Sequence, residues 1–186
     1  MLIDEFLPRY DFNEKHEIKI RASAEKVYAT VISIDMSDSW IISGLLALRG
    51  LGWKSPKTLT VQDMTKNGFA VLGEKPEREI LLGLAGKFWT LSGCMQDVNA
   101  KNFHEFDTKG YAKAVWNFSL TRSGKEEIRL GTETRVRCLD ESSLASFRFY
   151  WRFVQPFSGL IRQEMLRLVK QKAEENSEKY QHSNGK

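Results

Sequence analysis

Residues 142–176, SSLASFRFYWRFVQPFSGLIRQEMLRLVKQKAEEN, decide the fold of this chain. Their apolar side chains recur at alternating steps of three and four residues, which places them on one face of a long helix. At about 1.5 Å of rise per residue, such a helix would reach roughly 50 Å, so a compact domain requires a bend. Pro156, followed by Ser158 and Gly159, predicts that bend. The stripe consists of Phe147, Trp151, Val154, Ile161, Met165 and Leu168.

The first half of this helix carries aromatic residues beyond the main stripe, namely Phe149, Tyr150 and Phe153. A helix that is apolar over so much of its circumference is covered by a concave partner rather than laid on a flat layer. The sequence upstream alternates between apolar and polar residues, as an antiparallel sheet does. We therefore expect an α+β fold in which a curved antiparallel sheet wraps a long, kinked C-terminal helix.

The expected elements follow one another in a simple order. Residues 14–21 form a half-buried strand, Ser23 caps a short helix, and residues 40–48 form a second short helix. Strands are then predicted over 58–66, 68–74, 77–83, 111–122 and 126–139, with 87–89 as a bent strand or a loop. The faces carrying Ala112, Trp116 and Thr134 should point inward, and Arg135 and Arg137 should lie on the outer face, paired with carboxylates.

Composition is that of one ordinary globular domain. The chain has 186 residues, 41% of them hydrophobic and 28% charged. We expect an N-terminal arm over 1–13, a domain over 14–175 and a polar tail over 176–186. The net charge of +4 is small, and the basic residues are interspersed with acidic ones. This pattern does not favour a nucleic-acid partner, because such modules concentrate positive charge on one face.

No cofactor or metal is expected. The two cysteines, Cys94 and Cys138, form no CxxC or Cys/His cluster, and the three histidines have no metal-ligand spacing. The N-terminal segment MLIDEFLPRY lacks the features of a secretory signal, so we expect the protein in the cytoplasm. The most apolar run, 40–53, is too short to span a bilayer and contains Arg49, which argues against stable membrane insertion.

This order of elements resembles the helix-grip fold of the START and birch-pollen-allergen superfamily, also called SRPBCC, over residues 14–175. The phrases VYATVISIDMSDSWIISGLLALRGL, GLAGKFW, YAKAVWNFSL, TETRVRC and RFYWRFVQPFSGLIRQEMLR are similar to an uncharacterised bacterial branch of it. The resemblance implies binding of lipids, hormones, aromatic polyketides or other apolar molecules, and in a few members cyclase or aromatase activity. It implies no catalytic residues, since the superfamily shares no catalytic motif.

We therefore predict that the protein binds a hydrophobic or amphipathic small molecule, lipid-like or aromatic, between the sheet and the C-terminal helix. Large side chains could instead fill this space as a solid core; small residues on the inner faces, such as Ala112 and Ala114, favour a cavity. Arg148 and Arg152 could bind an acidic head group, or could stack on aromatic rings or extend into solvent. The predicted ligand-binding residues are Trp40, Phe69, Trp116, Phe118, Thr134, Phe147, Arg148, Trp151 and Gln155.

Two other functions remain open at this stage. One is a cyclase, aromatase or hydrolase using the same pocket, with Glu105, Asp107 or Arg148 as candidate groups. Glu105 and Asp107 would point to the same side of an extended segment, whereas His104 would point to the other. The second is a protein-interaction module that uses residues 40–53. The sequence does not indicate an oligomeric state.

Overall fold

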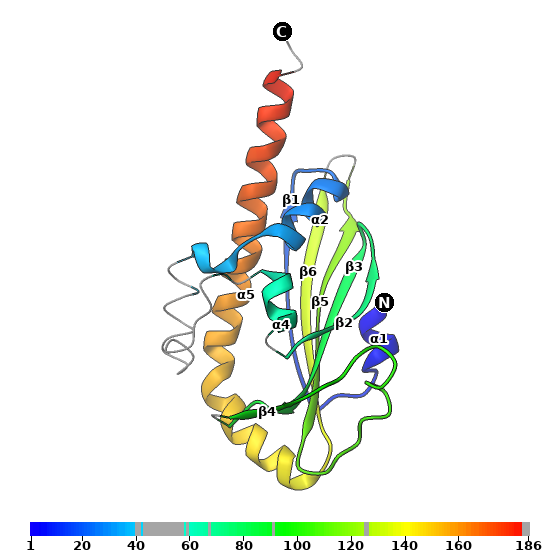
Figure 1. Cartoon of the computed structure of the whole chain (residues 1–186). Helices are drawn as coiled ribbons and strands as arrows, with labels where there is room; N and C mark the ends of the chain where they lie inside the picture. Colours follow the sequence, from blue (N-terminus) through cyan, green and yellow to red (C-terminus); the bar gives the residue numbers. More distant parts are fainter. Residues whose placement is uncertain are drawn as a thin grey trace.

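The computed structural model of the chain describes residues 1–39, 42, 58, 60–66, 68–90, 92–124 and 127–183, with side chains to residue 175. The predicted α+β class is confirmed (Figure 1). The elements are α1 (Leu2–Phe6), β1 (Phe12–Ile20), α2 (Ala24–Ser33), a 3-10 turn η1 (Met36–Asp38), α4 (Val61–Lys66), β2 (Ala70–Lys75), β3 (Glu79–Lys87), β4 (Gly93–Gln96), β5 (Ala112–Arg122), β6 (Ile128–Cys138) and α5 (Glu141–Ser183).

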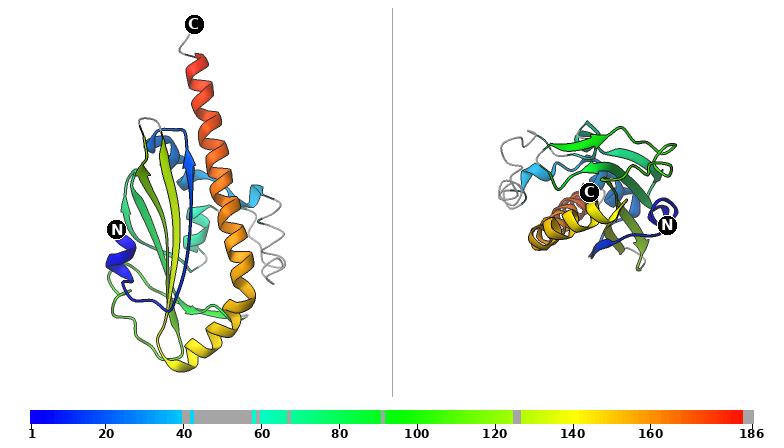
Figure 2. Two further views of the ribbon diagram at one scale, coloured as in Figure 1. Left: turned by 180° about the vertical axis from the view of Figure 1, so that it is seen from behind. Right: turned by 90° about the horizontal axis from the view of Figure 1, so that it is seen from below.

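The strands form one antiparallel sheet in the order β1-β6-β5-β3-β2, and β4 pairs with β3. The long strands β5 and β6 pair along their whole length, from Ala112 opposite Cys138 to Arg122 opposite Ile128. Helix α5 runs along one face of the sheet together with α2 and α4, and α1 lies on the opposite face (Figures 1 and 2). This is the arrangement of a sheet gripping a C-terminal helix, as predicted.

Helix α5 begins at a well-formed cap. The Asp140 carboxylate accepts the backbone N–H of Ser143 at 2.6 Å, and the Ser143 hydroxyl accepts the N–H of Asp140 at 3.2 Å. The helix then continues through Pro156 for 43 residues in all. Its axis turns between the first part and the straight part that follows, as Figure 2 shows. The predicted kinked helix is thus confirmed, and it extends beyond the predicted end at residue 176.

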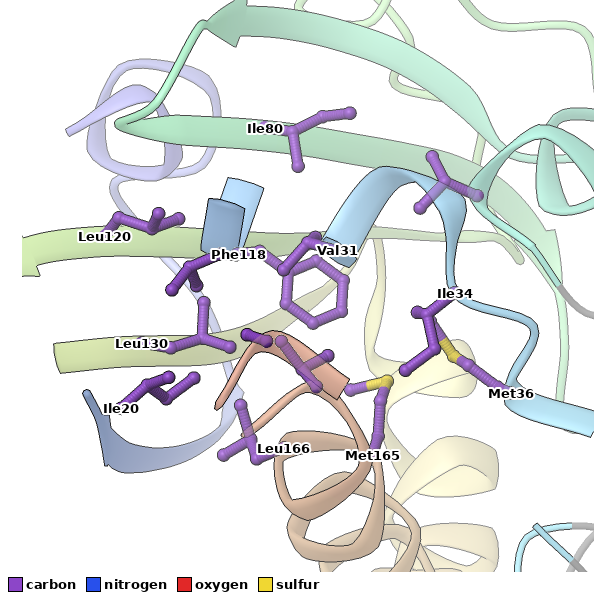
Figure 3. Close-up of a cluster of buried hydrophobic side chains, with 14 of the residues drawn as sticks. Ile20, Val31, Ile34, Met36, Ile80, Phe118, Leu120, Leu130, Met165 and Leu166 are labelled. Carbon is purple, nitrogen blue, oxygen red and sulfur yellow. The ribbon is translucent and has the colours of Figure 1, made fainter. Parts of the chain in front are cut away.

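The C-terminal half of α5 packs into a dense core with α2 and the central strands. Phe118 and Leu130 are completely buried there, as are Val31 and Val169, and Met165 is 1% exposed. Figure 3 shows Phe118 and Leu130 of the sheet, Val31 of α2 and Met165 of α5 converging there. Between these elements the described side chains pack as a solid core, which is the alternative to a cavity at this place.

The face of the sheet away from α5 is covered by the N-terminal segment, and Arg135 lies on this face paired with carboxylates, as predicted. Arg135 is only 9% exposed, and its guanidinium contacts Glu133 at 2.6 Å and Asp4 at 2.8 Å and donates to the α1 carbonyls of Ile3 and Leu7. At the other end of α1, a Glu79 oxygen accepts the N–H of Leu2 at 2.7 Å. The N-terminal arm therefore folds onto this face as a helix whose two ends meet charges that complement its dipole.

Two further expectations differ from the structure. Residues 61–66 form helix α4 rather than a strand; Thr60 and Asp63 bond each other reciprocally at its start. Strand β3 extends through Gly83 to Lys87, beyond the predicted end, with an irregular register against β4 at Ala85 and Lys87. The predicted helix at 40–48 and the interaction segment 40–53 lie, except for Ile42, outside the described residues.

Candidate functional site

A buried charged cluster joins α5 to the sheet. Arg162 of α5 lies 3.6 Å from Glu14 of β1, measured from Nη1 to Oε2, and the two side chains are 13% and 9% exposed. The guanidinium also donates to the Thr134 hydroxyl of β6 at 2.5 Å and to the Ser158 hydroxyl one helical turn earlier. The two neutral hydroxyls satisfy part of the hydrogen bonding of this buried pair and so offset part of the cost of removing it from water.

Close packing at Gly159 brings the helix onto this part of β1. A Cβ at Gly159 would stand 2.8 Å from Glu14 Oε1, which is closer than a Cβ approaches a non-bonded atom. The same Oε1 lies 3.1 Å from His16 Nε2, two residues along the strand. Oε2, by contrast, is buried and has no hydrogen-bond partner among the described residues. Among those residues, Oε2 faces only the Arg162 cation, at 3.6 Å, and accepts no hydrogen bond from it.

Trp116 of β5 lies next to this charged cluster and gives it an apolar wall. The Arg162 guanidinium carbon is 5.9 Å from the centre of the Trp116 ring. The indole Nε1–H donates to Thr132 at 2.6 Å, which fixes the orientation of the ring. Phe69 and Phe118 pack on either side, with ring centres 6.3 and 5.1 Å away. Trp116 and Phe69 remain partly exposed even though helices and sheet lie around them.

A second aromatic cluster surrounds the first turns of α5. Phe147 is 2% exposed and stacks on Trp151 with ring centres 5.7 Å apart. The rings of Phe12, Phe88 and Trp89 meet Phe147 edge-on at 4.8 to 6.0 Å. Next to this cluster, a hollow of about 620 Å³ opens to solvent, lined by Trp89, Ala145, Ser146, Phe149, Tyr150 and Phe153.

The predicted ligand-binding residues divide between these two places. Phe69, Trp116, Phe118 and Thr134 lie around the charged cluster, and Phe147 and Trp151 belong to the second aromatic cluster. Phe118 and Phe147 are buried, while Arg148 and Gln155 are exposed on α5. Trp40 lies outside the described residues.

Glu14, Ser158 and Arg162 were not among the predicted residues, although the sequence contains a signal for them. Glu14 is two residues before His16 and therefore in phase with the apolar positions of β1. Arg162 follows the stripe residue Ile161 and lies one turn before Leu166. A charged residue at a buried position of each element suggests a buried ion pair. Which residue of α5 faces Glu14 depends on how the helix crosses β1, and the sequence does not give this crossing.

The candidate acid–base groups are not brought to this site. His104 lies against α1, its ring stacked on Phe6 with centres 4.8 Å apart, and Glu105 and Asp107 are exposed in the same connection between β4 and β5. Lys113 donates to the carbonyls of Phe103 and His104 from the face of the sheet opposite α5. Burial lowers the pKa of Lys113, but both carbonyl contacts give it a structural role.

Within the described part of the chain, no group of three or more His, Cys, Asp or Glu side chains could hold a metal ion. Among the same residues, no helix combines the length and apolar character that crossing a bilayer requires.

No protein-family model matches the chain, and no curated protein sequence matches it. Among solved structures, a conserved protein from Geobacillus kaustophilus is 13% identical with a TM-score of 0.44, over 87% of this chain and 95% of that one. The di-domain aromatase/cyclase BexL of the BE-7585A biosynthetic pathway is 11% identical with a TM-score of 0.43, over 88% of this chain and 47% of that one. The ZhuI aromatase/cyclase from Streptomyces sp. R1128 is 10% identical with a TM-score of 0.29, over 85% of this chain and 93% of that one.

These similarities concern only the arrangement of helices and strands. The predicted arrangement was the helix-grip fold. At such identities and with TM-scores below 0.5, they carry no argument about ligand or activity. Function has to be argued from this chain's own side chains.

Proposed function

We propose that the protein binds an apolar or amphipathic small molecule between the sheet and the middle of α5, beside Trp116. The supporting observation is that packing differs along the interface between the sheet and α5. Toward α2 the space is filled, and Phe118 is completely buried; around Trp116, Phe69 and Thr134 the side chains lie between the layers and yet remain partly exposed. A surface of aromatic and small residues with a few polar groups is the usual composition of a ligand pocket.

The charged cluster defines which polar group the molecule carries. The Arg162 guanidinium is occupied by Glu14, Thr134 and Ser158, so it orients the site more than it offers a new contact. Glu14 Oε2 is the acceptor without a hydrogen bond. A hydroxyl on the ligand would satisfy it, and a buried acceptor left unsatisfied costs about 1–3 kcal/mol. The proposed ligand is therefore an apolar body, aromatic or lipid-like, with a hydroxyl donor.

Affinity would come mainly from burial of the apolar body. Apolar surface contributes roughly 25 cal/mol per Å² removed from water, before the entropic losses of binding. Phe69 and Trp116 would contact this body. Trp151 and Phe147 would limit its extent toward the second aromatic cluster, and Gln155 would lie at the outer margin.

Mass spectrometry of organic extracts from natively purified protein tests the proposal first, because a stoichiometric small molecule would identify the ligand class. The protein is then titrated with 2-naphthol and with 2-methoxynaphthalene, which is similar in shape but has no donor. We expect saturable binding of 2-naphthol and, from one lost hydrogen bond, about fivefold to tenfold weaker binding of the ether.

Two variants make the titration specific. Trp116→Ala should abolish binding, whereas Phe103→Ala, which removes a buried ring from the opposite face of the sheet, should lose stability and keep binding. The proposal is wrong if both variants bind 2-naphthol as the original chain does, or if Trp89→Ala, at the solvent-open hollow, is the change that abolishes binding.

A further inference from the structure

The first half of α5 turns an apolar stripe toward solvent. Phe149, Phe153 and Leu160, defined here as the aromatic stripe, are 71%, 58% and 51% exposed. Steps of four and seven residues place all three on one side of the helix. The rings of Phe149 and Phe153 contact each other edge-on, with centres 5.1 Å apart. This face lies on the other side of the helix from the stripe that packs on the sheet, and the proposed binding site does not use it.

The surroundings of the aromatic stripe are apolar and amphipathic. The hollow of about 620 Å³ lies beside it, and Trp89 and Tyr150 contribute to its lining together with Phe149 and Phe153. Tryptophan and tyrosine combine an apolar ring with a polar atom, which suits them to a boundary between water and an apolar phase. A contiguous apolar patch of this kind on a protein surface marks an interaction site.

Charge indicates the kind of partner. Residues 142–163 contain Arg148, Arg152 and Arg162 and no aspartate or glutamate. Arg162 is buried against Glu14, so the exposed cations of this segment are Arg148 and Arg152, which flank the aromatic stripe. A second copy docked on the same face would bring these arginines together without compensating carboxylates within the segment, which disfavours self-association.

We propose that this face of α5 docks on an anionic phospholipid surface. Aromatic and leucine side chains would enter the headgroup boundary while arginines on the flanks contact lipid phosphates, as in interfacial amphipathic helices. The helix lies in the plane of the interface and does not span it. This docking does not depend on the proposed ligand site, because it uses the opposite side of α5 and leaves Trp116 and Glu14 untouched.

Co-sedimentation with vesicles tests the docking. The intact chain is mixed with vesicles of phosphatidylcholine alone and with vesicles containing equal parts of phosphatidylcholine and phosphatidylglycerol. We expect sedimentation with the anionic vesicles only, weakened by added salt. Phe149→Ser/Phe153→Ser should reduce partitioning on the order of tenfold for each ring, and Arg148→Gln/Arg152→Gln about fivefold for each charge.

Val71→Ser is the matched control, because Val71 is an exposed apolar side chain, 41% exposed, on the distant strand β2. It should change partitioning by less than about twofold, as expected for an apolar side chain away from the contact. The proposal is overturned if the intact chain does not sediment with anionic vesicles. It is also overturned if Val71→Ser reduces vesicle partitioning as much as Phe149→Ser/Phe153→Ser does. The same holds if Arg148→Gln/Arg152→Gln sediments with anionic vesicles as well as the original chain does. Concentration-dependent dimerisation through the aromatic stripe in the absence of lipid would overturn it too.

Discussion

Replacing Arg162 by leucine should lower the free energy of unfolding, because it removes one charge of the buried pair. The substitution removes the cation and leaves the Glu14 carboxylate, 9% exposed, with His16 as its remaining contact. Breaking one partner of a buried ion pair costs about 3–5 kcal/mol, because an uncompensated charge stays in a poorly solvated place. That is a large part of the roughly 5–15 kcal/mol by which a domain is stable.

The second substitution separates the charge from the packing. In Glu14→Leu/Arg162→Leu neither charge is present, and apolar replacement of a whole buried pair is often neutral or stabilising. We expect the double variant to recover most of the loss seen in Arg162→Leu, giving a coupling energy of about 2–4 kcal/mol in the double-mutant cycle.

Urea unfolding at neutral pH measures these free energies of unfolding, including the deficit of Arg162→Leu. A deficit below about 1 kcal/mol with an unchanged urea dependence would refute the argument, since that is the size expected for a solvent-exposed pair. A double variant as unstable as the single one would refute it as well.

Three further predictions concern other parts of the fold. The Arg135 hydrogen bond lowers the pKa of Asp4, so Asp4 contributes stability above its unfolded pKa and loses it as pH falls through the folded value; Asp4→Asn should therefore be less stable than the original at neutral pH and equal to it in acid, as measured by thermal unfolding. Burial raises the pKa of the Cys138 thiol to about 12, so an aromatic disulfide reagent should modify exposed Cys94 quickly and Cys138 only on unfolding; two fast thiols in the native protein would contradict this. Gly83→Ala would make a Cβ overlap with Leu72 Cδ1 and should lower the free energy of unfolding by about 1–3 kcal/mol in urea, whereas Gly124→Ala, whose Cβ would meet Glu127 at an ordinary 3.6 Å, serves as the control.

Sequence periodicity predicted correctly the elements that have one buried face and one more exposed face. The three- and four-residue steps of α5 and the alternation along β5 and β6 each reflect one buried face, and the structure confirms all three elements. Residues 61–66 contain Val61 and Met64, three apart, inside a stretch that also alternates. A segment this short fits both periods, and the Thr60–Asp63 cap determined the outcome.

The buried face opposite α5 could not be predicted, because it depends on a contact between distant segments. Arg135 is buried by α1, which lies more than a hundred residues earlier in the chain. The strand pattern of alternating charged residues there is that of a solvated face. The site was predicted in part for a similar reason: Trp116 and Thr134 follow from inward-facing positions, whereas the Glu14–Arg162 pair depends on how α5 crosses β1.

The indole N–H resonance of Trp116 provides the most direct test of binding between the sheet and α5. This group donates to Thr132 at the centre of the proposed site, and Trp116→Phe assigns its signal in a two-dimensional NMR spectrum. During titration with 2-naphthol, we predict that this resonance shifts to saturation while the indole resonance of Trp89, at the solvent-open hollow, stays in place. A saturating shift of Trp89 with Trp116 unmoved would contradict the account, and so would a titration in which neither resonance moves.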